Sequence, residues 1–487
     1  MRAGPPLLEN IIQCLIKGKM NRYRPQSSFL SLISTGEKYA VASKGRYLAL
    51  EGSYLWIIKD YIDRTWMQNY IDLPDMSKRN ETQSNVPSSV SSKGADVMAA
   101  FAATAMRCGG CGAKVGATTV SRVLAEVYKR SKTSNNIDHD DAAIIPIDKN
   151  DEGGAMIHTI DFFRSFIDDP YLFGKVSAVH ALSDCHAMGA VPRTALALAV
   201  VQYSAVEEIT EKTLIAMLSG ACDIFDEESC SLIGGHTCEG IEQALGFAIH
   251  GFFPNPNKLF RKQGGQVGDL VVITKPIGTG ALFAANMRAK SSASHISEAL
   301  QYMCQSNGRA SQVAVDLNNM SNGECAIRAC TDVTGFGLIG HLLEMLVAND
   351  EVTSHERIGC ALRINDIPFL SGGIDASRNQ IYSSLHRDNF RNRRAVTNHT
   401  DAAKNSSILY PLLFDPQTAG GLLFFVNPLF SNQFIKALKE NGSPVSSVIG
   451  EIVAFQADEY ILDNDLCVIG GSRTGQRITI DYTTTMK

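Results

Sequence analysis

The chain has 487 residues, a formal net charge of −5 at pH 7 and a hydrophobic content of 45%. This length predicts about three domains, and the apolar content is enough to fill their cores. The acidic balance gives no general reason to expect nucleic acid, and no apolar run approaches the roughly 20 residues of a membrane span. The start lacks the layout of a secretory signal. Twelve scattered cysteines favour a reducing compartment, the cytoplasm, over a disulfide framework.

The leading part of the chain, residues 1–76, mixes amphipathic stretches with short strand-like runs at 39–42 and 47–50. The amphipathic run 55–70 suits a helix packed on its own small domain better than a helix lying on a membrane surface. Residues 77–105 begin with a polar, serine-rich stretch that cannot recover the entropy cost of ordering. We therefore expect a flexible linker there.

Helix-like and strand-like segments alternate after the linker, which indicates an α/β protein. Asp169-Pro170 is typical of a helix start, and the polar region 349–407 is expected to be rich in loops. The pattern predicts helices at 115–128, 172–188 and 214–225, and strands at 155–160, 195–203, 246–253 and 270–274.

A glycine-dense turn with two thiols and an amine, Cys108-Gly109-Gly110-Cys111-Gly112-Ala113-Lys114, precedes several acidic positions. Glycine permits close approach of backbone to a ligand. Carboxylate oxygens suit magnesium that bridges phosphates. Together these features suggest phosphoryl transfer assisted by a hard cation. The acidic positions are Asp140, Asp141, Asp161, Asp184 and Asp332.

Each of these features also has a structural interpretation. An isolated aspartate is often a turn residue or a helix cap. Gly235 follows the strand-like run 231–233 and can bring backbone N–H groups to phosphate, while His236 is equally compatible with a structural hydrogen bond. Cys108 and Cys111 form a Cys-x-x-Cys pair that permits a redox role, although two ordinary unpaired thiols remain an alternative and half a zinc site is less expected.

Seven motifs, in order, make the chain from about residue 106 resemble the selenophosphate synthetase (selenide, water dikinase) family. Ala113 replaces the second cysteine of the family's first motif, and His180 stands where the family usually has asparagine. The motifs are Cys111-Gly112-Ala113-Lys114, Asp140-Asp141-Ala142-Ala143, Asp161-Phe162-Phe163 with Asp168-Asp169-Pro170, Ser183-Asp184 with Ala187-Met188-Gly189, Gly234-Gly235-His236-Thr237, Thr331-Asp332-Val333-Thr334-Gly335-Phe336-Gly337 and Asp415-Pro416-Gln417-Thr418-Ala419-Gly420-Gly421.

The resemblance implies an α/β (α+β two-domain) fold. An ATP-binding N-terminal domain like that of aminoimidazole ribonucleotide synthetase, residues 106–268, would pair with a second subunit, and an α/β C-terminal domain, residues 269–487, would follow. The family reaction passes the γ-phosphoryl group of ATP to selenide and yields selenophosphate, AMP and orthophosphate with Mg²⁺. The implied partners are therefore ATP, selenide and a second copy of the chain, without nucleic acid or a transmembrane segment.

The resemblance also assigns residue roles. Cys111 and Lys114 match the catalytic positions. The expected metal ligands are Asp141, Asp184 and Asp332. The expected nucleotide contacts are Lys114, Asp138, His139, Asp140, Asp161, Asp184, Gly235, His236 and Thr237.

The leading segment resembles the C-terminal tail of flavin-dependent NADH dehydrogenases, which are fused upstream in some relatives. The glycine-rich dinucleotide fingerprint is absent, so flavin or NADH binding is not expected. Two alternatives to the dikinase reaction stay open. One is another ATP-using enzyme of the superfamily, such as aminoimidazole ribonucleotide synthetase or thiamine phosphate kinase. The other is a catalytically silent nucleotide-binding regulator.

Overall fold

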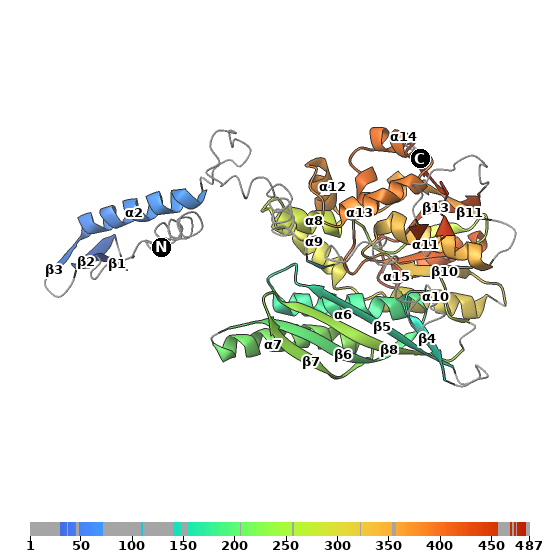
Figure 1. Cartoon of the computed structure of the whole chain (residues 1–487), viewed down its shortest axis with the longest axis horizontal. Coiled ribbons are helices and arrows are strands. Elements are labelled where there is room, and N and C mark those ends of the chain that lie inside the picture. The colour runs from blue at the N-terminus through green and yellow to red at the C-terminus, as the bar shows by residue number, and fades with distance from the viewer. Residues whose placement is uncertain are drawn as a thin grey trace, which may run out of the picture. The chain divides into compact units, whose positions relative to one another are not determined.

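The chain divides into two units, Met1–Thr104 and Ala105–Lys487 (Figure 1). The computed structural model describes residues 30–36, 38–44, 48–71, 109–110, 140–147, 154–204, 206–255, 258–321, 323–352, 357–455, 468–469, 472–473 and 475–483. The expected linker 77–105 and the expected helix 115–128 lie outside these residues. So do Cys108, Cys111, Lys114, Asp138 and His139.

The described residues of the first unit form an antiparallel three-stranded sheet and a helix. The strands β1 (Leu30–Gly36), β2 (Tyr39–Lys44) and β3 (Leu48–Gly52) pair in chain order, and α2 (Ser53–Ile71) follows. Leu55 packs with two buried alanines of β2, so the helix covers its own small sheet as expected. The predicted strands at 39–42 and 47–50 and the predicted helix at 55–70 are confirmed.

The second unit begins, within the described residues, with a five-stranded sheet in the order β4-β5-β8-β6-β7. All neighbours are antiparallel except β6 and β7, which run parallel. Alternate residues of β6 are buried, which is typical of a sheet with one covered face. The strands are β4 (Ala143–Pro146), β5 (Ala155–Arg164), β6 (Val191–Gln202), β7 (Ser231–Gly240) and β8 (Ala244–Phe253).

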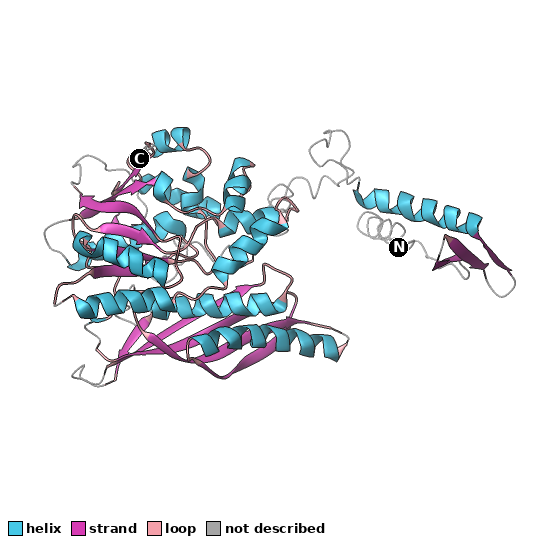
Figure 2. Cartoon of the chain, turned by 180° about the vertical axis from the view of Figure 1, so that it is seen from behind, coloured by secondary structure: helices cyan, strands magenta, loops and turns pink. Residues whose placement is uncertain are grey.

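Two helices, α6 (Pro170–Ala187) and α7 (Glu207–Glu227), cover one face of this sheet (Figures 1 and 2). The carboxylate of Asp169 caps α6 by accepting from the N–H groups of Tyr171 at 2.9 Å and Leu172 at 3.0 Å, and Pro170 occupies the first turn. Most of α6 is buried, because its other side packs against the domain built on the six-stranded sheet described below. The predicted helix start at Asp169-Pro170 is confirmed.

A six-stranded sheet forms the core of the remaining chain, in the order β10-β12-β9-β13-β11-β16. Its neighbours are antiparallel except β11 and β16. The strands are β9 (Leu270–Ile273), β10 (Ile327–Asp332), β11 (Ile358–Arg363), β12 (Leu422–Val426), β13 (Ser447–Ala454) and β16 (Ile478–Asp481), beside a separate pair, β14 (Val468–Ile469) and β15 (Ser472–Arg473).

Helices pack on both faces of the six-stranded sheet, with α11 over one face and α10 and α15 over the other. The α-helices are α8 (Thr279–Asn286), α9 (Ala293–Met303), α10 (Gly308–Met320), α11 (Gly337–Val352), α12 (Ser371–Arg378), α13 (His386–Asn389), α14 (His399–Asn405) and α15 (Ser431–Glu440). The 3₁₀ turns are η4 (Ile364–Asp366), η5 (Phe390–Ala395), η6 (Tyr410–Phe414) and η7 (Pro428–Phe430). In the described part of the chain, every helix is too short or too polar to cross a membrane.

The α/β fold class and the described helices and strands after the linker are confirmed, with shifted ends. The expectation of a loop-rich region at 349–407 is wrong, because β11, α12, α13, α14 and part of α11 lie there. Ile358, Cys360 and Leu362 of β11 are buried in the sheet although the surrounding sequence is polar. The helix predicted from residue 214 begins at Glu207. The prediction missed its first two turns because they are largely polar and exposed.

Candidate functional site

Three of the predicted carboxylates meet where the two sheets' domains pack together. Asp141, Asp184 and Asp332 each offer one carboxylate oxygen, and these oxygens lie within 4.8 Å of one another. Asp141 lies just before β4, Asp184 lies in the last turn of α6, and Asp332 ends β10. The fold thus brings together the complete set of expected metal ligands, which we call the carboxylate cluster.

The electrostatics of the carboxylate cluster favour a cation. Burial, followed by the charges of Asp332 and Glu344, raises the pKa of Asp141 to about 6 against the opposing effect of Lys262. Burial, then the neighbouring aspartates, also raises the pKa of Asp184 well above its ordinary value. Asp332 Oδ2 is buried and has no hydrogen-bond partner in the described structure. Oxygen donors at this spacing, one of them unsatisfied, fit Mg²⁺.

A buried lysine fixes one side of the carboxylate cluster. Lys262 Nζ lies 2.9 Å from Asp141 Oδ1 and 3.1 Å from Glu344 Oε2. Burial alone would lower the pKa of Lys262, but Asp141 and Glu344 outweigh it and hold the pKa well above its ordinary value. Thr331 adds a hydroxyl that donates to Asp141 Oδ1 at 3.0 Å. Asp141 is therefore held from two directions.

Asp184 is oriented from the five-stranded sheet, where the hydroxyl of Thr159 donates to its Oδ2. Asp161, two residues further along β5, faces His180 Nε2 at 3.7 Å. His180 is fully buried, and its Nδ1 accepts from the N–H of Ala419 at 3.2 Å. The histidine therefore links Asp161 to the loop that precedes β12. Asp161 also contributes to the raised pKa of Asp184, which places it beside the cluster.

Two other predicted or considered aspartates have structural contacts. Asp140 Oδ2 accepts from Arg261 Nη1 at 2.6 Å, and its Oδ1 accepts from the N–H of Lys262 at 3.1 Å. Asp415 Oδ2 accepts from the N–H of Ala281 at 3.0 Å in the first turn of α8, and burial raises its pKa to about 7. Both carboxylates thus have the turn or cap role that an isolated aspartate often has.

The Gly234-Gly235-His236-Thr237 motif does not follow a strand as expected. It lies inside β7, which continues to Gly240. Gly235 pairs with Ala197 of β6, and a Cβ at Gly235 would come within 2.2 Å of the Ala197 carbonyl oxygen. The glycine therefore permits close strand pairing, while His236 and Thr237 are exposed on the edge strand.

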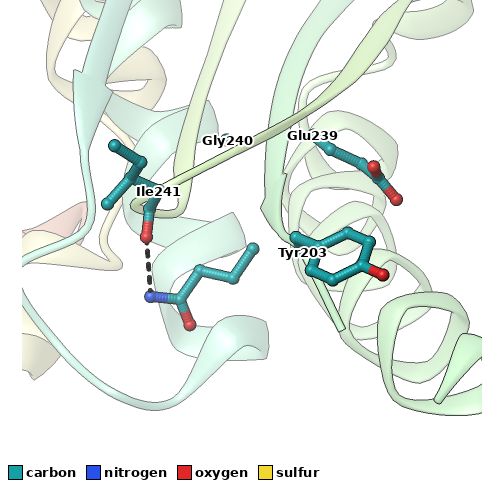
Figure 3. A pocket seen from close by; sticks show the side chains of 5 residues that line it. Tyr203, Glu239, Gly240 and Ile241 are labelled. Carbon is teal, nitrogen blue, oxygen red and sulfur yellow. Dashed lines mark hydrogen bonds between the residues drawn. The ribbon is translucent and has the colours of Figure 1, made fainter. Parts of the chain in front are cut away.

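β7 is separated from β5, which carries Asp161, by β8 and β6. Three strand spacings place the two strands about 14 Å apart. A shallow cavity of about 440 Å³ lies at the ends of β6 and β7. Figure 3 shows Tyr203 and Glu239 on one side of it and Ile241 on the other, where the Ile241 carbonyl accepts from Gln202 Nε2 at 3.1 Å.

The turn 108–114, which we call the thiol loop, is described in the structure only at Gly109 and Gly110. A Cβ at Gly109 would lie 2.2 Å from the carbonyl oxygen of Ser165, and one at Gly110 would lie 2.6 Å from Thr418 Oγ1. Gly110 also has a φ of +58°, which favours glycine. These two glycines pack closely against the protein itself, and the approach of the turn to a ligand stays a prediction. Its neighbours are the end of β5 and the loop before β12.

Known protein families match this chain over both sheets' domains. The model for AIR synthase related protein, N-terminal domain, matches residues 139–253, and the model for its C-terminal domain matches residues 266–463. A selenide, water dikinase from Pelobacter propionicus is 33% identical over 366 residues, which cover 73% of this chain and 96% of the relative. One from Nitrosomonas eutropha is 32% identical and covers 71% of this chain and 93% of the relative. This chain belongs to the selenide, water dikinase family.

Thiamine-monophosphate kinase from Stenotrophomonas maltophilia is among the solved structures with similarity to this dikinase family member. The two chains are 14% identical with a TM-score of 0.47, and the match covers 74% of this chain and 95% of that one.

Sequence reasoning missed the residues that support the expected metal ligands of this dikinase family member. Lys262 lies far from Asp141 in the sequence, and Glu344 lies inside an ordinary-looking helix, α11. Glu344 also lies 3.3 Å from His341 Nδ1, and although burial would raise its pKa, Lys262 and His341 lower the pKa to about 2. The only signal in the sequence was a charged residue, Lys262, close to the apolar Phe260. This pattern suggests that the lysine is partly buried but does not indicate which carboxylates it contacts.

Proposed function

We propose that this member of the family makes selenophosphate from selenide, water and ATP: the γ-phosphoryl group passes to selenide, and water cleaves the remaining phosphoanhydride to release AMP and orthophosphate. The observation that carries the proposal is the carboxylate cluster with its unpartnered Asp332 oxygen, in a chain that aligns with selenide, water dikinases along nearly their whole length. The family's reaction needs a site for a metal-bound triphosphate. The cluster is the best candidate for it among the described residues.

Asp141, Asp184 and Asp332 are proposed to hold Mg²⁺. The bound cation would neutralise phosphate charge, so that an anionic nucleophile can approach phosphorus. Lys262 keeps Asp141 in place and supplies a fixed positive charge, since its Nζ is only 2.9 Å from that carboxylate. The Thr159 hydroxyl orients Asp184 in the same way. Asp141 and Asp184 thus each have a partner that limits their motion before ATP arrives.

The remaining nucleotide contacts are also proposals. Asp161 lies beside Asp184 and is suited to the polyphosphate end of ATP. We propose that Asp140 acts indirectly, because its bond to Arg261 holds it next to Asp141 in the chain. Asp138 and His139 are proposed nucleotide contacts from the family resemblance alone. Gly235, His236 and Thr237 are proposed to contact ATP from the exposed edge strand β7.

The thiol loop is proposed to supply the two groups closest to the chemistry. The Lys114 amine would neutralise phosphate charge and favour a neighbouring thiolate. Cys111 would handle or deliver selenium. Gly109 and Gly110, which lie against Ser165 and Thr418, place the beginning of this loop within the second unit. This contact supports a loop that acts at the same domain's active site.

We propose a homodimer formed through the uncovered face of the five-stranded sheet. Residues of β5 alternate between the helix-covered face, where Ile157 is fully buried, and the other face, where Ile160 and Phe162 are 58% and 45% exposed. Ile145 of β4 and Ile233 of β7 are also exposed. Large apolar side chains exposed on a sheet face favour association with a partner. Within one chain, β7 lies far from Asp161. In a dimer, β7 of the second copy could contact the ATP bound beside Asp161 of the first.

A cytoplasmic location is proposed from the state of the cysteines. All eight cysteines in the described residues are free thiols. Several are buried, where oxidation would disrupt packing. A reducing compartment suits this arrangement.

The product nucleotide tests the proposed reaction. Purified protein with ATP and Mg²⁺ under anaerobic, reducing conditions is sampled with and without selenide, and the nucleotides are separated by chromatography. The proposal expects AMP to accumulate only when selenide is present. ADP as the sole stable product, or AMP formation that ignores selenide, would show another reaction. Omission of Mg²⁺ is the matched control and should abolish the selenide-dependent product.

A further inference from the structure

A basic hollow lies in the second unit on α13 and η5. It has a volume of about 410 Å³ and none of its lining residues belongs to the carboxylate cluster or the predicted ATP contacts. The segment 386–394 contains four arginines and one aspartate, in a chain whose net charge is −5. We call this feature the arginine hollow. It is lined by His386, Arg387, Phe390, Arg391, Arg393 and Arg394.

The arginine hollow concentrates positive charge at the surface. Arg387 and Arg394 are exposed, and the side chain of Arg391 is 56% exposed. Arg391 Nη2 lies 3.3 Å from Asp388 Oδ1, but exposed pairs of this kind contribute little. Within the segment 386–394 itself, four guanidinium groups accompany one carboxylate. A cleft lined by one sign of charge raises the local concentration of the opposite ion.

The floor of the arginine hollow is rigid and aromatic. The ring of His386 stacks on Tyr382 with centroids 4.4 Å apart and lies 5.6 Å from the ring of Phe390. Its Nε2 lies 2.9 Å from the carbonyl oxygen of Pro411, to which it can donate. Arg393 lies over Phe390 at 5.0 Å and donates to the Phe390 carbonyl at 3.1 Å. A ligand would therefore meet groups that are already ordered.

The segment that carries the arginines is fixed to the core of its domain. Asn389 is buried, and its Nδ2 donates to the carbonyl oxygens of Gly335 at 2.8 Å and Phe414 at 3.1 Å. These two carbonyls belong to the loop after Asp332 and to the turn before Asp415. The arginine hollow is thus a fixed feature of the folded domain.

We propose that the arginine hollow binds a small phosphate-bearing ligand, either orthophosphate or the phosphomonoester group of a nucleoside monophosphate. The planar fork of a guanidinium matches two phosphate oxygens at once, which a lysine cannot do. The volume lies in the range of small-molecule sites. A nucleic-acid surface is less suited, because the charges come from one short segment and do not form an extended track. The site does not depend on the selenophosphate reaction.

The test is equilibrium dialysis of the full chain with radiolabelled orthophosphate in EDTA, which removes metal-dependent binding. Wild type is compared with Arg387→Gln/Arg391→Gln. The matched control is Arg357→Gln/Arg378→Gln, which removes the same charge from two exposed arginines beside aspartates elsewhere. The proposal expects saturable binding in wild type and control and at least tenfold weaker binding in the hollow variant. Thermal unfolding of each variant checks the fold.

Further variants and ligands separate the possible outcomes. Arg387→Lys/Arg391→Lys keeps the charge without the fork and should bind with intermediate affinity, and Asp332→Asn should bind like wild type. Displacement of orthophosphate by AMP identifies a nucleoside monophosphate as the source, and failure of AMP to displace it identifies free phosphate. The proposal is overturned if wild type shows no saturable binding, if the control weakens equally, if Asp332→Asn abolishes binding, or if an RNA oligonucleotide displaces orthophosphate far more effectively than AMP.

Discussion

Lys262 Nζ and Asp141 Oδ1 lie 2.9 Å apart in the carboxylate cluster. Among the described residues, Asp184 accepts from the Thr159 hydroxyl, and Asp332 Oδ2 has no hydrogen-bond partner. The lysine is buried and also contacts Glu344 at 3.1 Å. The site therefore holds one permanent cationic group at one edge and leaves room for a mobile cation among the three carboxylates. This arrangement explains why a single buried ammonium does not satisfy the cluster.

Replacing Lys262 by methionine should destabilise the protein strongly. The change preserves much of the side chain's volume but leaves Asp141 and Glu344 buried without their shared cation. Breaking a buried pair from one side costs about 3 to 5 kcal/mol of unfolding free energy. Urea unfolding of the metal-free protein measures this loss of unfolding free energy. The control is Lys436→Met, which removes a lysine from an exposed ion pair. A Lys262→Met protein as stable as the control would show that the ion pair does not hold Asp141.

Replacing Asp332 by asparagine should abolish most ATP turnover while the fold stays intact. The substitution removes a charge but nearly preserves shape, and the metal supplies several kcal/mol of transition-state stabilisation, so we expect a loss of roughly a hundredfold or more. Asp316→Asn on the exposed side of α10 is the control. Steady-state assays and circular dichroism make the comparison. Full turnover in Asp332→Asn would refute the ligand role.

The benefit of Mg²⁺ to stability should grow as the pH rises from about 5 to about 7. The pKa of Asp141 is raised to about 6 and that of Asp184 is also raised, so the folded metal-free protein keeps protons that the unfolded chain has released. Proton binding by these carboxyl groups therefore stabilises the folded state at low pH, and this contribution to the free energy of unfolding is lost as the pH rises through their pKa values in the folded protein. Mg²⁺ compensates the ionised carboxylates.

Thermal unfolding with EDTA and with Mg²⁺ at both pH values measures this dependence. Asp415, whose pKa is raised to about 7, contributes in both conditions, so the difference between them isolates the carboxylate cluster. The same experiment on Asp332→Asn should show a much smaller Mg²⁺ effect. An Mg²⁺-induced shift in Tm that is equal at both pH values in wild type would contradict the assignment.

Replacing Ile160 by aspartate should convert the proposed dimer into a monomer. The side chain is 58% exposed on the uncovered face of the five-stranded sheet, where a charge would be buried by a second copy. Ile241→Asp is the matched control, because Ile241 is 93% exposed beyond the end of β7. Light scattering coupled to size-exclusion chromatography gives the mass. If Ile160→Asp has the same mass as wild type and control, that face is not the interface.

The sequence predicted those parts of the fold whose signals are local. Asp169 and Pro170 mark the start of α6 because a cap and a first-turn proline act within a few residues. Gly235 was interpreted as a residue after the strand-like run 231–233 that brings backbone N–H groups to phosphate. In the structure it lies within β7 and permits close pairing with Ala197 of β6. Only the three-dimensional arrangement distinguishes these two uses of glycine.

The candidate site was predictable to the same extent. Asp141, Asp184 and Asp332 follow from motifs that resemble one family, and the fold confirms that they meet. Lys262 and Glu344 could not be predicted, because their pairing depends on how α11 and the segment before β9 pack. The short helices between 371 and 405 were missed because elements of one or two turns show too little periodicity.

Phosphorus NMR of the reaction with selenide tests the central claim most directly. Protein, ATP, Mg²⁺ and selenide enriched in a spin-active selenium isotope are combined without oxygen. The account predicts a phosphorus signal split by selenium, together with AMP and orthophosphate. It also predicts that Cys111→Ser and Lys114→Ala lose this signal while Cys108→Ser keeps it. ATP turnover by wild type without any selenium-split phosphorus signal, with ADP as the stable product, would contradict the account.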